Sequence, residues 1–129
     1  MIRLTDSIAR LYQAAYACRN DDPSTSRTAR LLRSSRSKMA KKLAEEAVEV
    51  VIDTMHGDRE SVIKESADLI YNLVVLWISS GIKPEDVWKE MDRRERLFGI
   101  AEKVPKKLPE EFPRRKVVLL EGRRAPKRR

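Results

Sequence analysis

Two short stretches of the chain place acidic residues inside otherwise apolar, helix-forming sequence. Residues 45–49 and 65–68 together contribute five carboxylates: Glu45, Glu46, Glu49, Glu65 and Asp68. Residues three or four positions apart share one face of a helix, so two such helices packed together would hold these carboxylates against one another. Like charges that close are costly unless a cation neutralises them, and carboxylate oxygens suit Mg²⁺, with Mn²⁺ as the alternative. We therefore expect a metal site that serves chemistry on phosphates.

The alternative is that these acids are solvated residues of ordinary helix surfaces. Glu49 is followed by the apolar run of residues 50–52, and Asp68 by the apolar residues 69 and 70. Acids within apolar stretches are rarer than acids on polar faces, which favours the metal site. Asp53, one turn beyond Glu49, is interpreted as a solvated acid near the helix end rather than as a ligand of a second metal ion.

Basic residues precede the acids and are candidates for binding phosphate groups. Lys38 and Lys42 stand eight and four positions before Glu46, and Arg27 and Arg30 lie in a preceding short helical segment. Ordinary salt bridges at i, i+4 are the alternative role, and they are worth only about 0.3–0.5 kcal/mol per pair. A helix that lies against a triphosphate would instead use these cations to bind it.

Two further side chains follow the second acidic stretch. Asn72 comes one turn after Asp68, so it is expected to face the site and to hydrogen-bond a ribose or a water molecule. A satisfied buried amide is the alternative for Asn72. Tyr71 is interpreted as a core residue rather than as a platform on which a base stacks.

Local signals predict the helices that position these residues. Thr5 or Asp6 is expected to cap a first helix, and Asp58 to cap a later one that ends at Gly81. Pro84 is expected in the first turn of the last helix. After the first helix, the sequence predicts helices over residues 27–32, 36–52, 58–80 and 84–99, and a short strand over residues 117–120.

Short connections between these segments favour an all-α antiparallel helical bundle. Residues 48–52 and 69–78 are apolar around most of the helix circumference, which requires burial on nearly all sides. One small chain cannot easily provide that burial, so we expect the bundle to be completed by homodimerisation about a two-fold axis.

The 129 residues suffice for one domain, which we assign to residues 1–102. These residues carry 17 Lys/Arg and 17 Asp/Glu, so their charges cancel. Residues 103–129 carry 11 Lys/Arg and 3 Asp/Glu, so the whole net charge of +8 belongs to this C-terminal extension. Four prolines and like charges predict that this extension is mobile. We expect it to attract nucleic acid only weakly and without sequence preference.

Other classes of protein are disfavoured by the sequence. The single Cys18 excludes an intramolecular disulfide. The N-terminal residues do not resemble a signal peptide, and the longest apolar run is too short to span a bilayer. We therefore expect a cytoplasmic protein without membrane contact.

The acidic pattern E-E-x-x-E followed by E-x-x-D, formed by Glu45, Glu46, Glu49, Glu65 and Asp68, resembles the MazG-like all-α nucleoside triphosphate pyrophosphohydrolases. A closer resemblance, over roughly residues 4–94, is to the phosphoribosyl-ATP pyrophosphohydrolase family of histidine biosynthesis. It rests on residues 26–32 (SRTARLL), 41–52 (KKLAEEAVEVVI), 57–59 (GDR) and 67–71 (ADLIY). The family usually has glycine at the position of Ala44 and within residues 33–35, and often has histidine in place of Asn72.

The resemblance implies Mg²⁺-dependent cleavage between the α and β phosphates, which releases pyrophosphate and phosphoribosyl-AMP. It makes Glu46, Glu49, Glu65 and Asp68 the metal ligands, with Glu46 and Glu49 also counted as catalytic. Glu45 is then an outer-shell residue or a base that orients the attacking water. The residues expected to bind the nucleotide are Arg27, Arg30, Lys38, Lys42 and Asn72.

Two other functions are left open by the sequence. A house-cleaning pyrophosphohydrolase for non-standard nucleoside triphosphates is favoured by the changes at Ala44, Asn72 and residues 34–35. A nucleic-acid-binding module would use the basic extension. That extension has one aromatic residue, Phe112, and no zinc-ligand or RNA-binding motif, which disfavours the second alternative.

Overall fold

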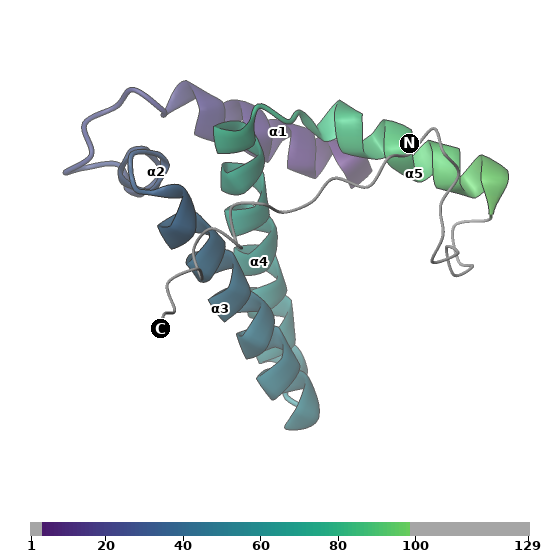
Figure 1. The fold of residues 1–129 in the computed structure, drawn as a ribbon. Coiled ribbons are helices and arrows are strands. Elements are labelled where there is room, and N and C mark those ends of the chain that lie inside the picture. Colours follow the sequence, from purple (N-terminus) through teal and green to yellow (C-terminus); the bar gives the residue numbers. More distant parts are fainter. Residues whose placement is uncertain (1–3, 99–129) are drawn as a thin grey trace, which may run out of the picture. The chain divides into compact units, whose positions relative to one another are not determined.

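The computed structural model describes residues 4–98, and within them every regular element is a helix. The helices are α1 (Leu4–Ala17), α2 (Arg27–Leu32), α3 (Arg36–Met55), α4 (Arg59–Ser80) and α5 (Pro84–Leu97) (Figure 1). The all-α fold class is thereby confirmed. The strand predicted over residues 117–120 and the whole basic extension lie outside the described residues.

Local chemistry explains where most of the helices begin and end. Asp58 caps α4 and accepts hydrogen bonds from the backbone N–H and the hydroxyl of Ser61, at 3.2 and 2.9 Å. These bonds hold the pKa of Asp58 below its ordinary value. Gly81 ends the same helix with a φ of 73°, a left-handed conformation that glycine adopts without strain. The predicted cap and stop of α4 are thus confirmed.

The predicted cap of the first helix is wrong. Helix α1 already begins at Leu4, so Thr5 and Asp6 lie within it. A favourable cap is worth only about 1 kcal/mol, so cap chemistry alone does not fix the first residue of a helix.

Helices α3 and α4 form the antiparallel pair that carries the acidic stretches. They make the most extensive contact between elements of the described chain, and they lie side by side in Figure 1. Gly57, with a φ of 72°, lies in the short connection between them. At the other end of the pair, the buried residues Leu31, Met39 and Val75 join α2, α3 and α4 in one apolar cluster.

One face of α3 exposes apolar side chains. Val48, Val51, Ile52 and Met55, here called the apolar stripe, follow the i, i+3, i+4, i+7 spacing of a single helix face. Val51 is 60% exposed and Met55 is 79% exposed. On α4, Ile63 and Ile70 are also exposed.

The chain divides at residue 91, and the described residues 4–91 belong to the first compact unit. Every candidate site residue belongs to the first unit. The domain boundary predicted at residue 102 lies outside the described residues. Among residues 4–98, no helix is both long enough and apolar enough to cross a membrane.

Candidate active site

Carboxylates from α3 and α4 meet between the two helices. One oxygen from each of Glu46, Glu65 and Asp68 lies within 4.8 Å of the others, and the same holds for Glu49, Asp53 and Glu65. We call these five residues the acid cluster. Glu65 belongs to both groups of three. The Glu46 side chain is only 14% exposed, so it is not an ordinary solvated surface acid.

Crowding in the acid cluster changes the proton affinity of Glu65. Its pKa is raised from 4.5 to about 7. The main cause is a hydrogen bond shared with the Glu46 carboxyl group, followed by loss of solvent and by the charges of Glu46, Asp68 and Glu49. A hydrogen bond between two carboxyl groups requires a proton on one of them, so the cluster takes up a proton near neutral pH when no cation is bound.

The structure brings together the four predicted metal ligands and adds one residue. Asp53 is half-buried and lies with Glu49 and Glu65, which fits the alternative to a solvated acid, the role of a ligand of a second metal ion. Its position four residues after Glu49 was the available signal, because that spacing repeats the face of the helix that packs on α4. Glu45 is exposed and belongs to neither group of three.

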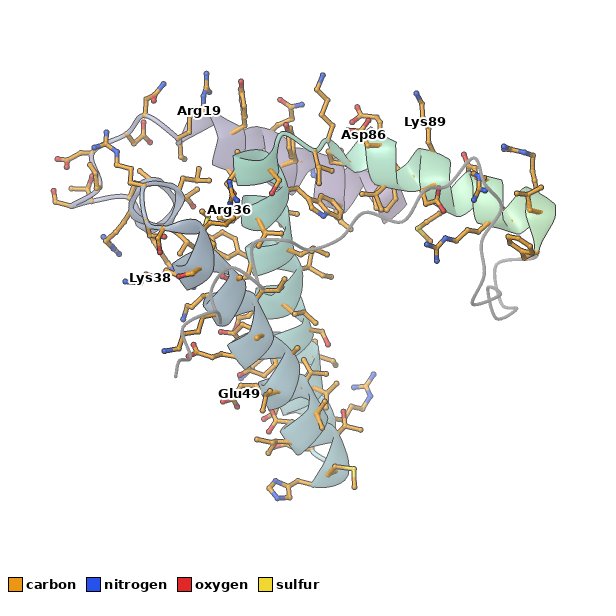
Figure 2. The ribbon with its side chains drawn as sticks, viewed as in Figure 1. Arg19, Arg36, Lys38, Glu49, Asp86 and Lys89 are labelled. Carbon is orange, nitrogen blue, oxygen red and sulfur yellow. The ribbon has the colours of Figure 1, made fainter. Side chains whose placement is uncertain are left out.

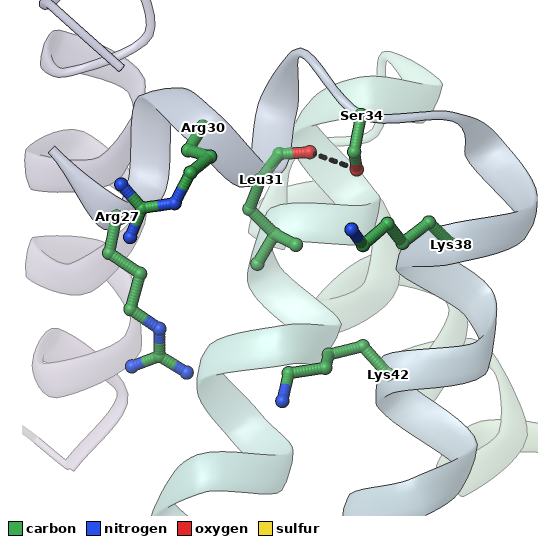
Figure 3. Close-up of a pocket in the computed structure, with 6 residues that line it drawn as sticks. All are labelled: Arg27, Arg30, Leu31, Ser34, Lys38 and Lys42. Atoms are coloured by element: carbon green, nitrogen blue, oxygen red, sulfur yellow. Dashed lines mark hydrogen bonds between the residues drawn. The ribbon is translucent and has the colours of Figure 1, made fainter. Parts of the chain in front are cut away.

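A pocket with four basic side chains lies beside the acid cluster. It has a volume of about 220 Å³ and is lined by Arg27, Arg30, Leu31, Ser34, Lys38 and Lys42. We call it the basic pocket. In Figure 3 the two arginines reach it from α2 and the two lysines from α3, on the opposite side. The structure thus brings together the four predicted phosphate-binding cations.

One helix connects the basic pocket to the acid cluster. The Lys42 ammonium lies 4.0 Å from the Glu46 carboxylate, one turn further along α3. Figure 2 shows Lys38 near the start of α3 and Glu49 further along the same helix. Positive and negative charges are therefore sorted along α3, with cations near its start and carboxylates beyond them.

Tyr71 fastens α2, which carries the two arginines, to α4. Its hydroxyl shares a 2.6 Å hydrogen bond with the hydroxyl of Thr28. The guanidinium of Arg27 lies over the Tyr71 ring, 4.9 Å from its centroid. Arg30 donates a 2.7 Å hydrogen bond to the Pro23 carbonyl. Tyr71 therefore does more than fill the core, which its sequence position did not reveal.

Asn72 is enclosed rather than open to the pocket. It is 2% exposed, and its Nδ2 donates a 2.8 Å hydrogen bond to the Asp68 carbonyl of the preceding turn. Its Oδ1 is buried and accepts no hydrogen bond from the part of the chain that the structure describes. The alternative of a fully satisfied amide therefore does not hold within these residues.

Known proteins are similar to the part of the chain that contains this site. The profile of the phosphoribosyl-ATP pyrophosphohydrolase family matches residues 9–95, which include the acid cluster and the basic pocket. A phosphoribosyl-ATP pyrophosphatase 2 of Bradyrhizobium diazoefficiens is 59% identical over 97% of this chain and 99% of its own length. A protein of the same name from Rhodopseudomonas palustris is 67% identical over 80% of this chain and 79% of its own.

A more distant relative gives the same result. The phosphoribosyl-ATP pyrophosphatase of Gluconobacter oxydans is 49% identical over 74% of this chain and 72% of its own length. The family profile covers the two acidic helices and the segment that supplies the arginines, and the relatives each align with about three quarters of the chain or more. The chain therefore belongs to the phosphoribosyl-ATP pyrophosphohydrolase family.

Proposed function

We propose that this chain hydrolyses phosphoribosyl-ATP to phosphoribosyl-AMP and pyrophosphate, the second step of histidine biosynthesis. The observation that carries the proposal is the acid cluster beside the basic pocket, inside the region that matches the family. Hydrolysis of a polyphosphate needs both parts, because the phosphates must be bound and their charge neutralised before water can attack.

The acid cluster has the donor set that a hard divalent cation requires. All its donor atoms are carboxylate oxygens, and the raised pKa of Glu65, caused first by its hydrogen bond with Glu46, shows how closely these carboxylates approach one another. Glu46, Glu49, Glu65 and Asp68 would hold Mg²⁺, or Mn²⁺ in its place, and Asp53 would add a ligand on the Glu49 side. When bound, the cation would neutralise phosphate charge and favour the developing charge of the transition state.

The remaining residues have roles that follow from their positions. Glu45, next to Glu46 but exposed, would orient the attacking water and accept its proton. Arg27, Arg30, Lys38 and Lys42 would bind phosphate groups of the nucleotide. The buried acceptor Oδ1 of Asn72 would take a hydrogen bond from an ordered water, since an unsatisfied buried acceptor costs about 1–3 kcal/mol, whereas its enclosure does not fit contact with a ribose hydroxyl.

The active molecule would be a homodimer in the cytoplasm. The apolar stripe on α3, with Ile63 and Ile70 of α4, supports a second copy as the covering surface, because contiguous exposed apolar residues mark interaction sites. The basic extension would attract nucleic acid only weakly and without sequence preference.

A comparison of substrates tests the function. Purified protein with saturating Mg²⁺ is assayed for pyrophosphate release from phosphoribosyl-ATP, ATP and dUTP, with Glu49→Gln as the inactive control. We expect kcat/KM to be highest for phosphoribosyl-ATP. A tenfold preference for a plain nucleoside triphosphate, about 1.4 kcal/mol in transition-state binding, would instead indicate a house-cleaning pyrophosphohydrolase.

A further inference from the structure

The basic pocket is built to hold an anion that is separate from the acid cluster. Four cations line it and no acid of residues 4–98 does, although Lys42 also contacts Glu46 at 4.0 Å. A phosphate monoester carries a charge of about −1.5 to −2 near neutral pH and offers three acceptor oxygens, which suits a small pocket with convergent cations.

Arg27 is held in place within this pocket by an aromatic ring. Its guanidinium lies 4.9 Å from the Tyr71 centroid, and the Thr28 hydroxyl next to it in sequence is joined to the Tyr71 hydroxyl at 2.6 Å. An exposed arginine would otherwise lose side-chain entropy when it binds an anion. A ring that already restrains it reduces this cost.

The position of the pocket indicates which phosphate group of the substrate it holds. The pocket begins beside the acid cluster, where Lys42 lies 4.0 Å from Glu46, and extends to Lys38, eight residues before Glu46 and about 12 Å away along the helix at 1.5 Å per residue. The cleaved anhydride must lie at the acid cluster, where a metal ion would neutralise the triphosphate. The phosphate at the phosphoribosyl end is the other anionic group, and it lies far from the cleaved bond.

We propose, building on the proposed function, that the basic pocket binds the phosphate monoester at the phosphoribosyl end of the substrate, and that Tyr71 is a positioning residue which aligns Arg27 for that contact. The pocket then distinguishes phosphoribosyl-ATP from a plain nucleoside triphosphate. Tyr71 touches neither reacting group in this arrangement, so its effect is on binding of the remote phosphate.

The test uses two small anions as probes of the two ends of the substrate. Binding of ribose 5-phosphate and of Mg²⁺-pyrophosphate to the full chain is measured by calorimetry for the wild type, Tyr71→Leu, Tyr71→Phe and Arg27→Met. Arg36→Met is the matched control, because it removes one exposed positive charge of α3 that does not line the pocket.

We expect Arg27→Met and Tyr71→Leu to weaken binding of ribose 5-phosphate by about tenfold, or ~1.4 kcal/mol, and to leave Mg²⁺-pyrophosphate unchanged. Tyr71→Phe keeps the ring under Arg27, so its affinity for ribose 5-phosphate should fall less than that of Tyr71→Leu. Arg36→Met should change neither affinity. In turnover, KM for phosphoribosyl-ATP should rise in Tyr71→Leu while kcat changes little.

Two results would overturn the inference. If Arg27→Met and Tyr71→Leu weakened the binding of both probes equally, the pocket would belong to the triphosphate end of the substrate. If Arg27→Met bound ribose 5-phosphate as tightly as the wild type, the pocket would not bind the phosphate of the phosphoribosyl end. Arg27 is exposed, so its variant keeps the test decisive even if Tyr71→Leu fails to fold. Failure of the proposed function gives a different result, in which the wild type does not release pyrophosphate from phosphoribosyl-ATP whatever the probe affinities are.

Discussion

At the scale of single residues, Glu65 connects the two halves of the acid cluster. It belongs to both groups of three carboxylates, and its pKa is about 7, mainly because of its hydrogen bond with Glu46. Protons and divalent cations compete for such a site, so metal binding should tighten as the pH rises through 7.

The stability of the metal-free protein should fall as the pH rises from about 4.5 to 7. The pKa of Glu65 is higher in the folded chain than in the unfolded chain, so the folded state binds more protons in this window, and deprotonation favours unfolding. The measurement is the melting temperature in EDTA across this pH range. Glu65→Gln should make the melting temperature depend less on pH. An equally steep dependence in this variant would show that Glu65 is not the group responsible.

Removal of one carboxylate should stop turnover without unfolding the chain. We expect Glu49→Gln and Asp68→Asn to lower kcat by more than about 100-fold, a larger loss than the 10–100-fold typical of outer-shell metal partners. Without metal, both variants should melt at a higher temperature than the wild type, because like-charge repulsion is relieved. Glu60→Gln is the control, since the Glu60 side chain is 76% exposed on α4. If Glu49→Gln or Asp68→Asn kept a near wild-type kcat at saturating Mg²⁺, the assignment of these residues as metal ligands would be wrong.

At the scale of helices, α3 has different chemistry on different faces. Its acids Glu46, Glu49 and Asp53 take part in the acid cluster with α4, whereas the apolar stripe remains exposed in the single chain. The sequence predicted that α3 and α4 carry more apolar residues than one chain can bury. The sequence did not indicate which of those apolar residues are buried within one chain, because their burial depends on how the helices pack.

A charge placed on the apolar stripe should separate the proposed dimer. Val51→Asp puts a carboxylate on a residue that is 60% exposed in the single chain, so the monomer fold should survive while burial of the stripe becomes unfavourable. Sedimentation velocity measures the change. Thr54→Asp, an exposed position of α3 outside the stripe, should leave the association state as it is. A wild type that sediments as a monomer would refute the dimer itself.

Helix ends and charge patterns were predictable because they depend on neighbours in the sequence. Asp58 and Gly81 have the local chemistry of a cap and a stop, and the i, i+4 spacing placed the cations before the acids. The burial of Asp53 beside Glu65 and the contacts of Tyr71 with α2 were not predictable in this way, although the i, i+4 spacing did place Asp53 on the same face of α3 as Glu49. They depend on how α2, α3 and α4 align, which side-chain packing determines across positions distant in sequence.

At the scale of the whole molecule, the candidate site and the excess positive charge belong to different parts of the chain. The acid cluster and the basic pocket lie within residues 27–68, whereas residues 103–129 carry the net charge of +8. The high isoelectric point therefore describes the extension and says little about the substrate.

Deletion of the residues after Lys107 should leave folding and hydrolysis largely intact. The deleted segment carries most of the excess positive charge, so the truncated chain should elute from heparin at a much lower salt concentration. Circular dichroism and kcat/KM for the truncated and full chains measure the two effects. Loss of the dimer on deletion would show that residues 117–120 take part in the assembly.

Because cations precede carboxylates along α3, the basic pocket and the acid cluster are joined by the segment from Lys42 to Glu46. The number of residues in this segment sets both the distance and the angle between them. One alanine inserted after Leu43 would turn all later residues by about 100° and direct the acids away from α4. Four inserted alanines would nearly restore the direction but lengthen the separation by about 6 Å. If the two regions bind the two ends of one substrate, as proposed, the substrate would fix the permitted length of this segment, and insertions here should be tolerated far less than insertions in the loop between α1 and α2.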